Sequence, residues 1–151
     1  MILRSANTMA TASESAKINL DFLVNELGLK QERKTKIFRK GDIFVVSPSV
    51  QNKHNTFDIE ESIMDLFDDE VNEGYLLVRF KDEFLMTKLK PFQKKMMTID
   101  TQPNTAKLPP HWKFKVLEAA NPYILNLGDS DLRFPMQAPS RTQLVKFFDK
   151  Q

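Results

Sequence analysis

Hydrophobic residues in the first third of the chain follow first a helical and then a strand-like pattern. Apolar positions three and four residues apart predict a helix over residues 14–27, because this spacing aligns side chains along one helix face. Ser13 or Ser15 is expected to cap its start, and Gly28 stands past its end, where a left-handed residue is common. The β-branched and aromatic run at residues 43–47 predicts a strand. The apolar positions of the helix are Ile18, Leu20, Phe22, Leu23 and Leu27.

A second helical pattern covers residues 58–70. Asp58 and Glu61 are three positions apart, which is the spacing of an acidic capping box, and they indicate where this helix begins. The apolar residues that follow recur at intervals of three and four and predict one buried face. These residues are Ile59, Ile63, Leu66 and Phe67.

From Tyr75 onward the hydrophobic period changes to two, which predicts a series of strands joined by short turns. Ser140 and Gln143 then form a second capping-box pattern and predict a final helix over residues 140–149. The expected strands cover residues 75–80, 84–88, 95–100, 112–116 and 122–126.

This order of elements predicts an α+β fold. Short strands with tight turns favour an antiparallel sheet or a small, partly open β-barrel of five to seven strands, flanked by about three helices. Residues 1–15 lack a hydrophobic period and are interpreted as a flexible tail, and residues 16–151 are expected to form a single globular domain.

Composition narrows the classes of function. The chain of 151 residues has no Cys and only two His, so disulfides, thiol catalysis and Cys-based zinc sites are excluded and a His-rich metal site is not favoured. No apolar run approaches the roughly 18 residues of a transmembrane helix, and the first residues lack the apolar stretch of a signal peptide. We therefore expect a protein of the cytoplasm or another intracellular compartment, without a cofactor, a bound metal or a membrane partner.

The charges are segregated along the sequence. The totals are nearly balanced, with 22 Lys and Arg against 20 Asp and Glu. Residues 58–73, however, hold eight acids and no base, which leaves 22 bases against 12 acids in the other 135 residues. A basic body of this kind is typical of proteins that bind polyanions.

The preferred hypothesis is therefore non-enzymatic binding of nucleic acid, DNA or RNA, through contacts with phosphates. The basic segment 30–40 and a basic sheet face are expected to supply the contacts, while Trp112 is interpreted as a core residue, with base stacking as the alternative. The candidate residues are Lys30, Arg33, Lys34, Lys36, Arg39, Lys40, Arg79, Lys88, Lys90, Lys94, Lys95, Lys113 and Lys115.

Two alternatives use the acidic residues. In the first, the chain is an interaction or assembly module whose acidic helix docks a basic protein partner through Asp65, Asp68, Asp69 and Glu70. In the second, the chain is a divalent-metal nuclease, with Asp82 and Glu83 or the 68–70 carboxylates as metal ligands. No strand carries the Glu-x-Lys spacing expected of such a nuclease, so an enzyme is the less favoured interpretation.

The segments Lys40–Val46 and Gly74–Leu89 resemble the strand pattern of LexA-type self-cleaving repressor domains. The resemblance implies a shared β architecture. The family's activity is not expected here, because its nucleophilic Ser lies upstream of the Gly-Asp turn, where residues 30–40 contain no Ser. In addition, the position of the family's basic Lys falls on Thr87, with Lys88 out of register.

Overall fold

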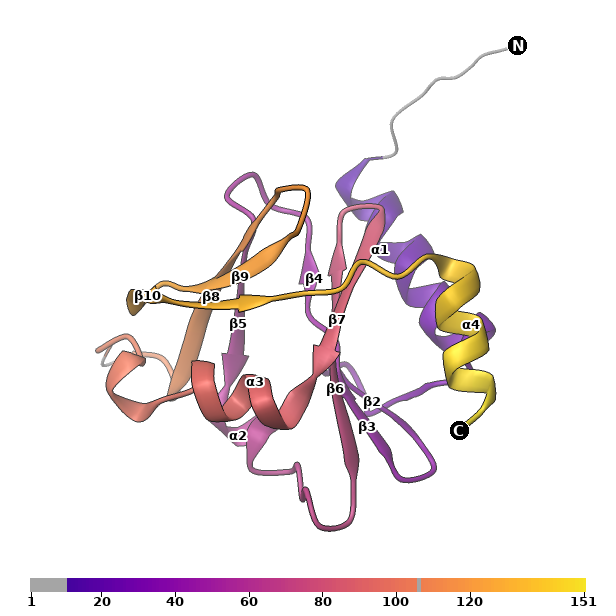
Figure 1. The fold of residues 1–151 in the computed structure, drawn as a ribbon, viewed down its shortest axis with the longest axis horizontal. Coiled ribbons are helices and arrows are strands. Elements are labelled where there is room, and N and C mark those ends of the chain that lie inside the picture. Colours follow the sequence, from indigo (N-terminus) through magenta and orange to yellow (C-terminus); the bar gives the residue numbers. More distant parts are fainter. Residues whose placement is uncertain (1–10, 106) are drawn as a thin grey trace.

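The computed structural model describes residues 11–105 and 107–151, which form an α+β fold of three layers (Figure 1). A sheet of six strands lies in the middle, with helices against one face and a second sheet of four strands against the other. Strand β6 (Glu73–Phe80) shows how this layering follows from a period of two: Leu76 and Val78 face the second sheet, whereas Tyr75 and Leu77 face the helices. The expected α+β class is confirmed, with two sheets in place of a single one and no closed barrel.

The remaining elements of the described residues are as follows. The helices are α1 (Ala12–Asp21), which continues as a π-helical turn over Phe22–Glu26, α2 (Glu61–Met64), α3 (Leu89–Met96), a 3-10 turn (Ile99–Thr101) and α4 (Arg141–Asp149). The other strands are β1 (Lys30–Gln31), β2 (Ile37–Lys40), β3 (Ile43–Val46), β4 (Ser49–Val50), β5 (Thr56–Glu60), β7 (Glu83–Lys88), β8 (His111–Leu117), β9 (Tyr123–Asn126) and β10 (Asp129–Pro135).

The long strand β6 organises the first sheet. On one edge it pairs in parallel with β3 along its first half and with β4 along its second half, and on the other edge it forms an antiparallel hairpin with β7. Strands β2 and β1 extend the sheet beyond β3. The second sheet is antiparallel throughout, in the order β10-β9-β8-β5.

The last passage of the chain between the two sheets runs past β7. After β10 the chain runs across to the first sheet, where the backbone N–H and C=O of Met86 and Gln137 bond reciprocally at 2.8 and 3.0 Å. The chain then enters α4, whose start is confirmed: Ser140 caps it, and Gln143 returns the bond of the capping box. This crossing places residues 134–147 over the free edge of β7 (Figure 1).

The predicted helix over residues 58–70 is wrong. Residues Thr56–Glu60 form strand β5, in which Phe57 and Ile59 face the core and alternate with half-buried polar residues. Pairing with β8 sets Asp58 opposite Lys113, with an ion pair of 3.5 Å. The helical spacing of the apolar residues was therefore outweighed by a cross-strand partner, and only Glu61–Met64 is helical.

The predicted strand over residues 95–100 is also wrong. Helix α3 covers Leu89–Met96, and its Leu89, Phe92 and Met96 are buried at spacings of three and four. The helix tolerates Pro91 because this residue lies in its first turn, where the missing N–H has no intrahelical partner to lose.

The first helix begins earlier than predicted. Thr11 caps α1 together with Glu14, in place of Ser13 or Ser15, so residues 12–15 are helical and do not belong to a tail. Gly28 has the expected left-handed φ of 70°. The part of the predicted tail before residue 11 lies outside the described residues. No helix within residues 11–105 and 107–151 is long and apolar enough to span a membrane.

Candidate nucleic-acid interface

The thirteen predicted cations do not form one surface. Arg79 is 7 % exposed and lies under the β3–β4 connection, while Lys113 and Lys115 belong to the second sheet. The predicted basic sheet face is therefore wrong as a continuous surface. Six of the thirteen make polar contacts within the chain: Lys36, Arg39, Lys40, Arg79, Lys90 and Lys113.

Much of the 30–40 segment is used to hold the fold together. Lys36 donates to the Asp58 carbonyl at 2.6 Å and pairs with a carboxylate of the same strand. Arg39 pairs with Glu32, and its guanidinium carbon lies 4.7 Å from the centre of the Phe44 ring. Lys40 donates to the last turn of α4 at 2.6 Å. These cations are half-buried and are therefore less available to an external polyanion than the sequence indicates.

The acidic segment supplies several of the partners. Glu60 pairs with Lys36 at 2.9 Å, Asp69 with Lys90 at 2.6 Å, and Asp58 with Lys113. The Lys90 ammonium accordingly lowers the pKa of Asp69. The two poles of charge seen along the sequence thus meet in space, where surface pairs contribute only about 0–1 kcal/mol each.

The predicted acidic docking helix is absent from the described residues. Asp65, Asp68, Asp69 and Glu70 lie in the turns between α2 and β6, all of them exposed, and the Asp68 carboxylate accepts a bond from the Glu70 N–H at 3.0 Å. Such turns do not align carboxylates along one face. The carboxylates of the proposed nuclease site are dispersed as well: Asp82 accepts a bond from Ser15 at 2.6 Å, and the described residues contain no group of three acids or His positioned as metal ligands.

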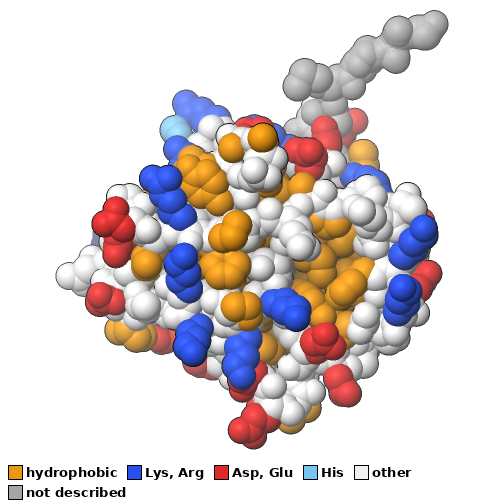
Figure 2. Space-filling model, in the orientation of Figure 1, with side chains coloured by type: hydrophobic (Ala, Val, Ile, Leu, Met, Phe, Trp, Pro, Cys, Tyr) orange, Lys and Arg blue, Asp and Glu red, His pale blue; other side chains and the backbone are white. Residues whose placement is uncertain are grey.

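Helix α3 carries the main group of exposed cations. The buried residues of α3 pack into the core between the two sheets, so the opposite face of the helix is exposed to solvent. That face has Lys94 and Lys95 in its last turns, Lys90 at its start and Lys88 as its N-terminal cap. Lys88, Lys94 and Lys95 form no ion pair with any described residue. Figure 2 shows Lys and Arg side chains gathered over α3 and the neighbouring edge of the second sheet.

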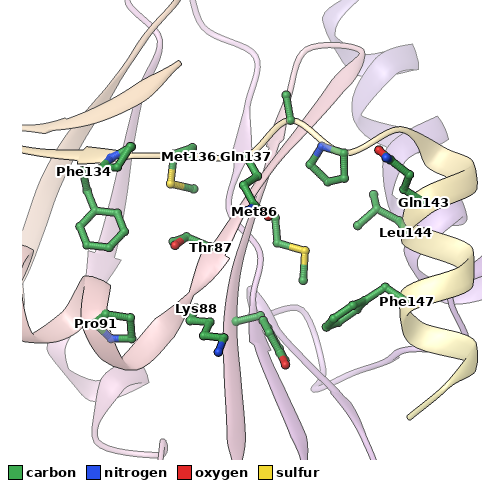
Figure 3. A pocket seen from close by; sticks show the side chains of 14 residues that line it. Met86, Thr87, Lys88, Pro91, Phe134, Met136, Gln137, Gln143, Leu144 and Phe147 are labelled. Atoms are coloured by element: carbon green, nitrogen blue, oxygen red, sulfur yellow. The ribbon is translucent and has the colours of Figure 1, made fainter. Parts of the chain in front are cut away.

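An apolar groove lies beside Lys88, at the start of α3. It has a volume of about 900 Å³ and runs from α3 to α4 across the last residues of β7, below the crossing segment that follows β10. In Figure 3, Phe134 and Pro91 lie on the α3 side of the groove, and Leu144 and Phe147 on the α4 side. Lys88 is part of the lining, so the groove and the cationic surface of α3 are continuous. Volumes of roughly 300–1,000 Å³ are typical of ligand sites.

The aromatic walls of the groove are held by other rings. Phe134 meets Phe92 at 5.3 Å between ring centres, edge to face, and Phe147 meets Tyr75 at 5.1 Å in the same manner. Both outer rings are half-buried, so each keeps an accessible surface. Polar groups that could bond the edge of a ligand come from Thr87, Lys88, Gln137 and Gln143.

Sequence reasoning missed this groove because its lining residues form no motif and follow no hydrophobic period. Phe134 and Met136 stand in a stretch broken by two prolines, Pro135 and Pro139, where no period is visible. Phe147, on the last helix, is half-buried and lines the groove. The only sequence signal for the groove was the short stretch of apolar residues interrupted by Pro135 and Pro139, a pattern typical of an exposed connecting segment.

Tyr75 provides a pH-dependent test of this region. Burial, together with the hydrogen bond that its hydroxyl donates to Glu73, raises the pKa of Tyr75 well above the ordinary value of about 10. Above a pH of about 10, Tyr75 is ionised in the unfolded chain but still protonated in the folded protein. The free energy of unfolding should therefore fall as the pH rises above about 10. Urea unfolding across an alkaline pH series should show this fall in the wild type and a shallower one in Tyr75→Phe.

Tyr123→Phe, on strand β9, is the matched control for that series. If the stability of Tyr75→Phe falls with pH as steeply as that of the wild type, the alkaline loss of stability does not come from Tyr75.

A second, smaller pocket of about 410 Å³ lies at Arg79, on the side of the first sheet near β5. It gathers Lys34 and Lys36 from the basic segment with Arg79, together with Asp58 and Glu60. Seven of the thirteen predicted cations therefore lie either at this pocket or on α3 and its cap. No model of a known protein family matches the chain and no curated protein is significantly similar to it, so its function is inferred from these two sites.

Proposed function

We propose that this protein binds nucleic acid without catalysis, with phosphates on the lysines of α3 and unpaired bases in the adjoining groove. One observation carries the proposal: Lys88, which has no carboxylate partner among the described residues, lines a groove walled by aromatic rings, and Lys94 and Lys95, equally without such partners, extend the cationic surface along α3. Cationic tracks beside aromatic platforms are the usual means by which proteins hold single strands.

The two parts of the site have different tasks. Lysine contacts with phosphates release condensed counterions and give affinity that depends on salt. The faces of Phe134 and Phe147 accept any base, because stacking depends on the π surface and not on the base edge. The groove is open only to bases that are not already stacked in a duplex, which favours single strands.

Charge reversal on α3 tests the phosphate contacts. Lys94→Glu combined with Lys95→Glu should weaken binding of a fluorescent single-stranded oligonucleotide about tenfold or more at low salt. Because each single-strand phosphate contact contributes about 0.7 to the slope of log affinity against log salt, the slope should fall in magnitude by about 1.4. Fluorescence anisotropy at several salt concentrations measures both quantities, with duplex of the same sequence for comparison.

Lys17→Glu is the control, since Lys17 is equally exposed but lies on α1, away from the groove. An equal loss in the control and the α3 variant would show only the effect of net charge. No binding to either form of nucleic acid at low salt would overturn the proposal.

The two alternative functions receive less support. Of the four acids expected to dock a partner, Asp69 is already paired with Lys90, and the turns between α2 and β6 do not align the others along one face. A metal nuclease would need carboxylates in one cluster, and the described acids at residues 68–70 and 82–83 are not arranged in that way.

A further inference from the structure

Arg79 is the most unusual charged residue among those described. It lies on β6 and is 7 % exposed, and no other described Lys, Arg, Asp or Glu is buried to this degree. The described residues include no carboxylate within ion-pair distance of it. Burial of a charged group is costly unless an opposite charge compensates it, so an isolated guanidinium in the interior requires an explanation.

The contacts of Arg79 leave part of its guanidinium unused. Its Nε donates to the Ser47 hydroxyl at 3.1 Å and its Nη2 to the Ser47 carbonyl at 2.7 Å. These bonds use two of the five N–H groups, and the Phe38 ring lies beside the guanidinium at 5.5 Å. Burial lowers the pKa of Arg79 to about 10, so the group is still cationic at neutral pH. Positioned by Ser47 and Phe38, it is a fixed charge with spare donors.

A pocket of about 410 Å³ opens onto this charge. Its rim carries Lys34 and Thr35 from the turn before β2 and Ser49 from β4, and all three of these side chains are exposed. The Thr35 hydroxyl already donates to the Glu32 carbonyl at 2.6 Å, so the pocket offers a ligand the Arg79 and Lys34 cations and the Ser49 hydroxyl, from three separate segments of the chain. A hydroxyl and an ammonium at the mouth, with a planar guanidinium at the base, suit the several oxygens of a phosphate.

The carboxylates of the pocket do not cancel these charges. Glu60 pairs with Lys36 at 2.9 Å and Asp58 with Lys113 at 3.5 Å, so each acid already has its own lysine. Lys34 forms no ion pair with a described residue. Arg79 and Lys34 thus remain as the uncompensated charge of the pocket.

We propose that this pocket binds a phosphate-type oxyanion, either free phosphate or a phosphomonoester, with Arg79 at its base and Lys34 and Ser49 at its mouth. A terminal phosphate of nucleic acid and inorganic phosphate offer the same chemistry. The free-phosphate case is independent of the function proposed above, whereas the terminal-phosphate case adds a second contact to it.

Calorimetric titration of the full chain with inorganic phosphate, at constant ionic strength in chloride, tests the site. Phosphate should bind the wild type, and Lys34→Glu should weaken binding at least fivefold. Arg33→Glu is the matched control, because Arg33 is the exposed neighbour of Lys34 and does not line the pocket. No heat of binding in the wild type, or an equal loss in both variants, would overturn the proposal.

A second variant avoids any change at Arg79 itself, whose loss could disturb folding through Ser47. Ser49→Asp places a carboxylate of the protein in the pocket, where it should raise the melting temperature and abolish the response to phosphate. Asn52→Asp adds the same charge on an exposed residue outside the pocket and should do neither. A Ser49→Asp protein that still binds phosphate as the wild type does would contradict the site.

Two oligonucleotides distinguish the source of the phosphate. If a 5′-phosphorylated strand binds more tightly than its 5′-hydroxyl twin, and Ser49→Asp removes the difference, the ligand is a terminal phosphate. Equal binding of the twins, together with binding of inorganic phosphate, supports free phosphate. Because the 5′-hydroxyl strand needs only α3 and the groove, its binding reports on the proposed function separately.

Discussion

Replacing Phe92 with alanine is expected to lower the free energy of unfolding by about 4 kcal/mol. Phe92 is fully buried on the inner face of α3, between the two sheets. Its ring meets Phe114 of β8 at 5.3 Å and Phe134 of β10 at the same distance, so truncation leaves a cavity that none of these strands can fill without losing its pairing. Urea unfolding followed by circular dichroism measures the change.

Ile99→Ala is the control for this experiment. Ile99 is a large apolar residue in the short turn that follows α3, but it is 68 % exposed, so its truncation should change stability by less than about 0.5 kcal/mol. A loss in Phe92→Ala no greater than that in Ile99→Ala would show that α3 does not close the space between the sheets. Because Phe92 also supports the Phe134 wall of the groove, a folded Phe92→Ala protein should bind single strands less tightly.

Gly128→Ala should destabilise the fold by about 3 kcal/mol. A Cβ added at Gly128, in the turn between β9 and β10, would lie 2.0 Å from the Thr101 carbonyl oxygen, which is far inside contact distance. The added Cβ is fixed to the backbone and the Thr101 carbonyl belongs to the backbone, so a side-chain rotation cannot relieve the clash. Thermal and urea unfolding of the purified variant measure the loss.

A hydrogen-bond network adds to that cost. The Gly128 N–H donates to the buried Asn126 at 2.7 Å, and the Asn126 amide donates to the Met96 carbonyl at 2.8 Å and to Thr101 at 3.0 Å. A displaced turn therefore leaves buried polar groups without partners.

Gly41→Ala is the matched control for the glycine variant. Gly41 has a φ of 57°, but an added Cβ there meets no atom within 4 Å, so only the backbone strain of about 1–2 kcal/mol remains. Equal losses in the two variants would show that the clash at Thr101 is relieved by movement of the turn.

The elements that could be predicted from sequence are those whose local preferences agree with their surroundings. The hairpin of β6 and β7 has a period of two along both strands, and the last helix has a complete capping box. Prediction was wrong where two local signals competed. Ile59 fits a helical spacing with Ile63 and a strand-like alternation with Phe57, and pairing with Lys113 and its neighbours in β8 decided for the strand.

The candidate site was predictable only in part. The distribution of lysines directed attention to Lys88, Lys94 and Lys95, which stay exposed because α3 has an apolar inner face. The groove beside Lys88 could not be foreseen, since the β6–β7 hairpin brings Tyr75 and Met86 together but Phe147 joins them only because of the crossing after β10. A groove that forms between separate elements leaves no hydrophobic period and no motif in the sequence.

By itself, the sequence determined the α+β class, the caps of the last helix and the excess of basic residues outside residues 58–73, because local periodicity and composition are properties of the chain alone. Only the tertiary structure decided which charges are used. It paired Asp58, Glu60 and Asp69 with lysines of the chain, and it buried Arg79 without a described carboxylate partner. Coulomb energy depends on distance and on the surrounding dielectric, and both are set by the fold and not by the order of residues.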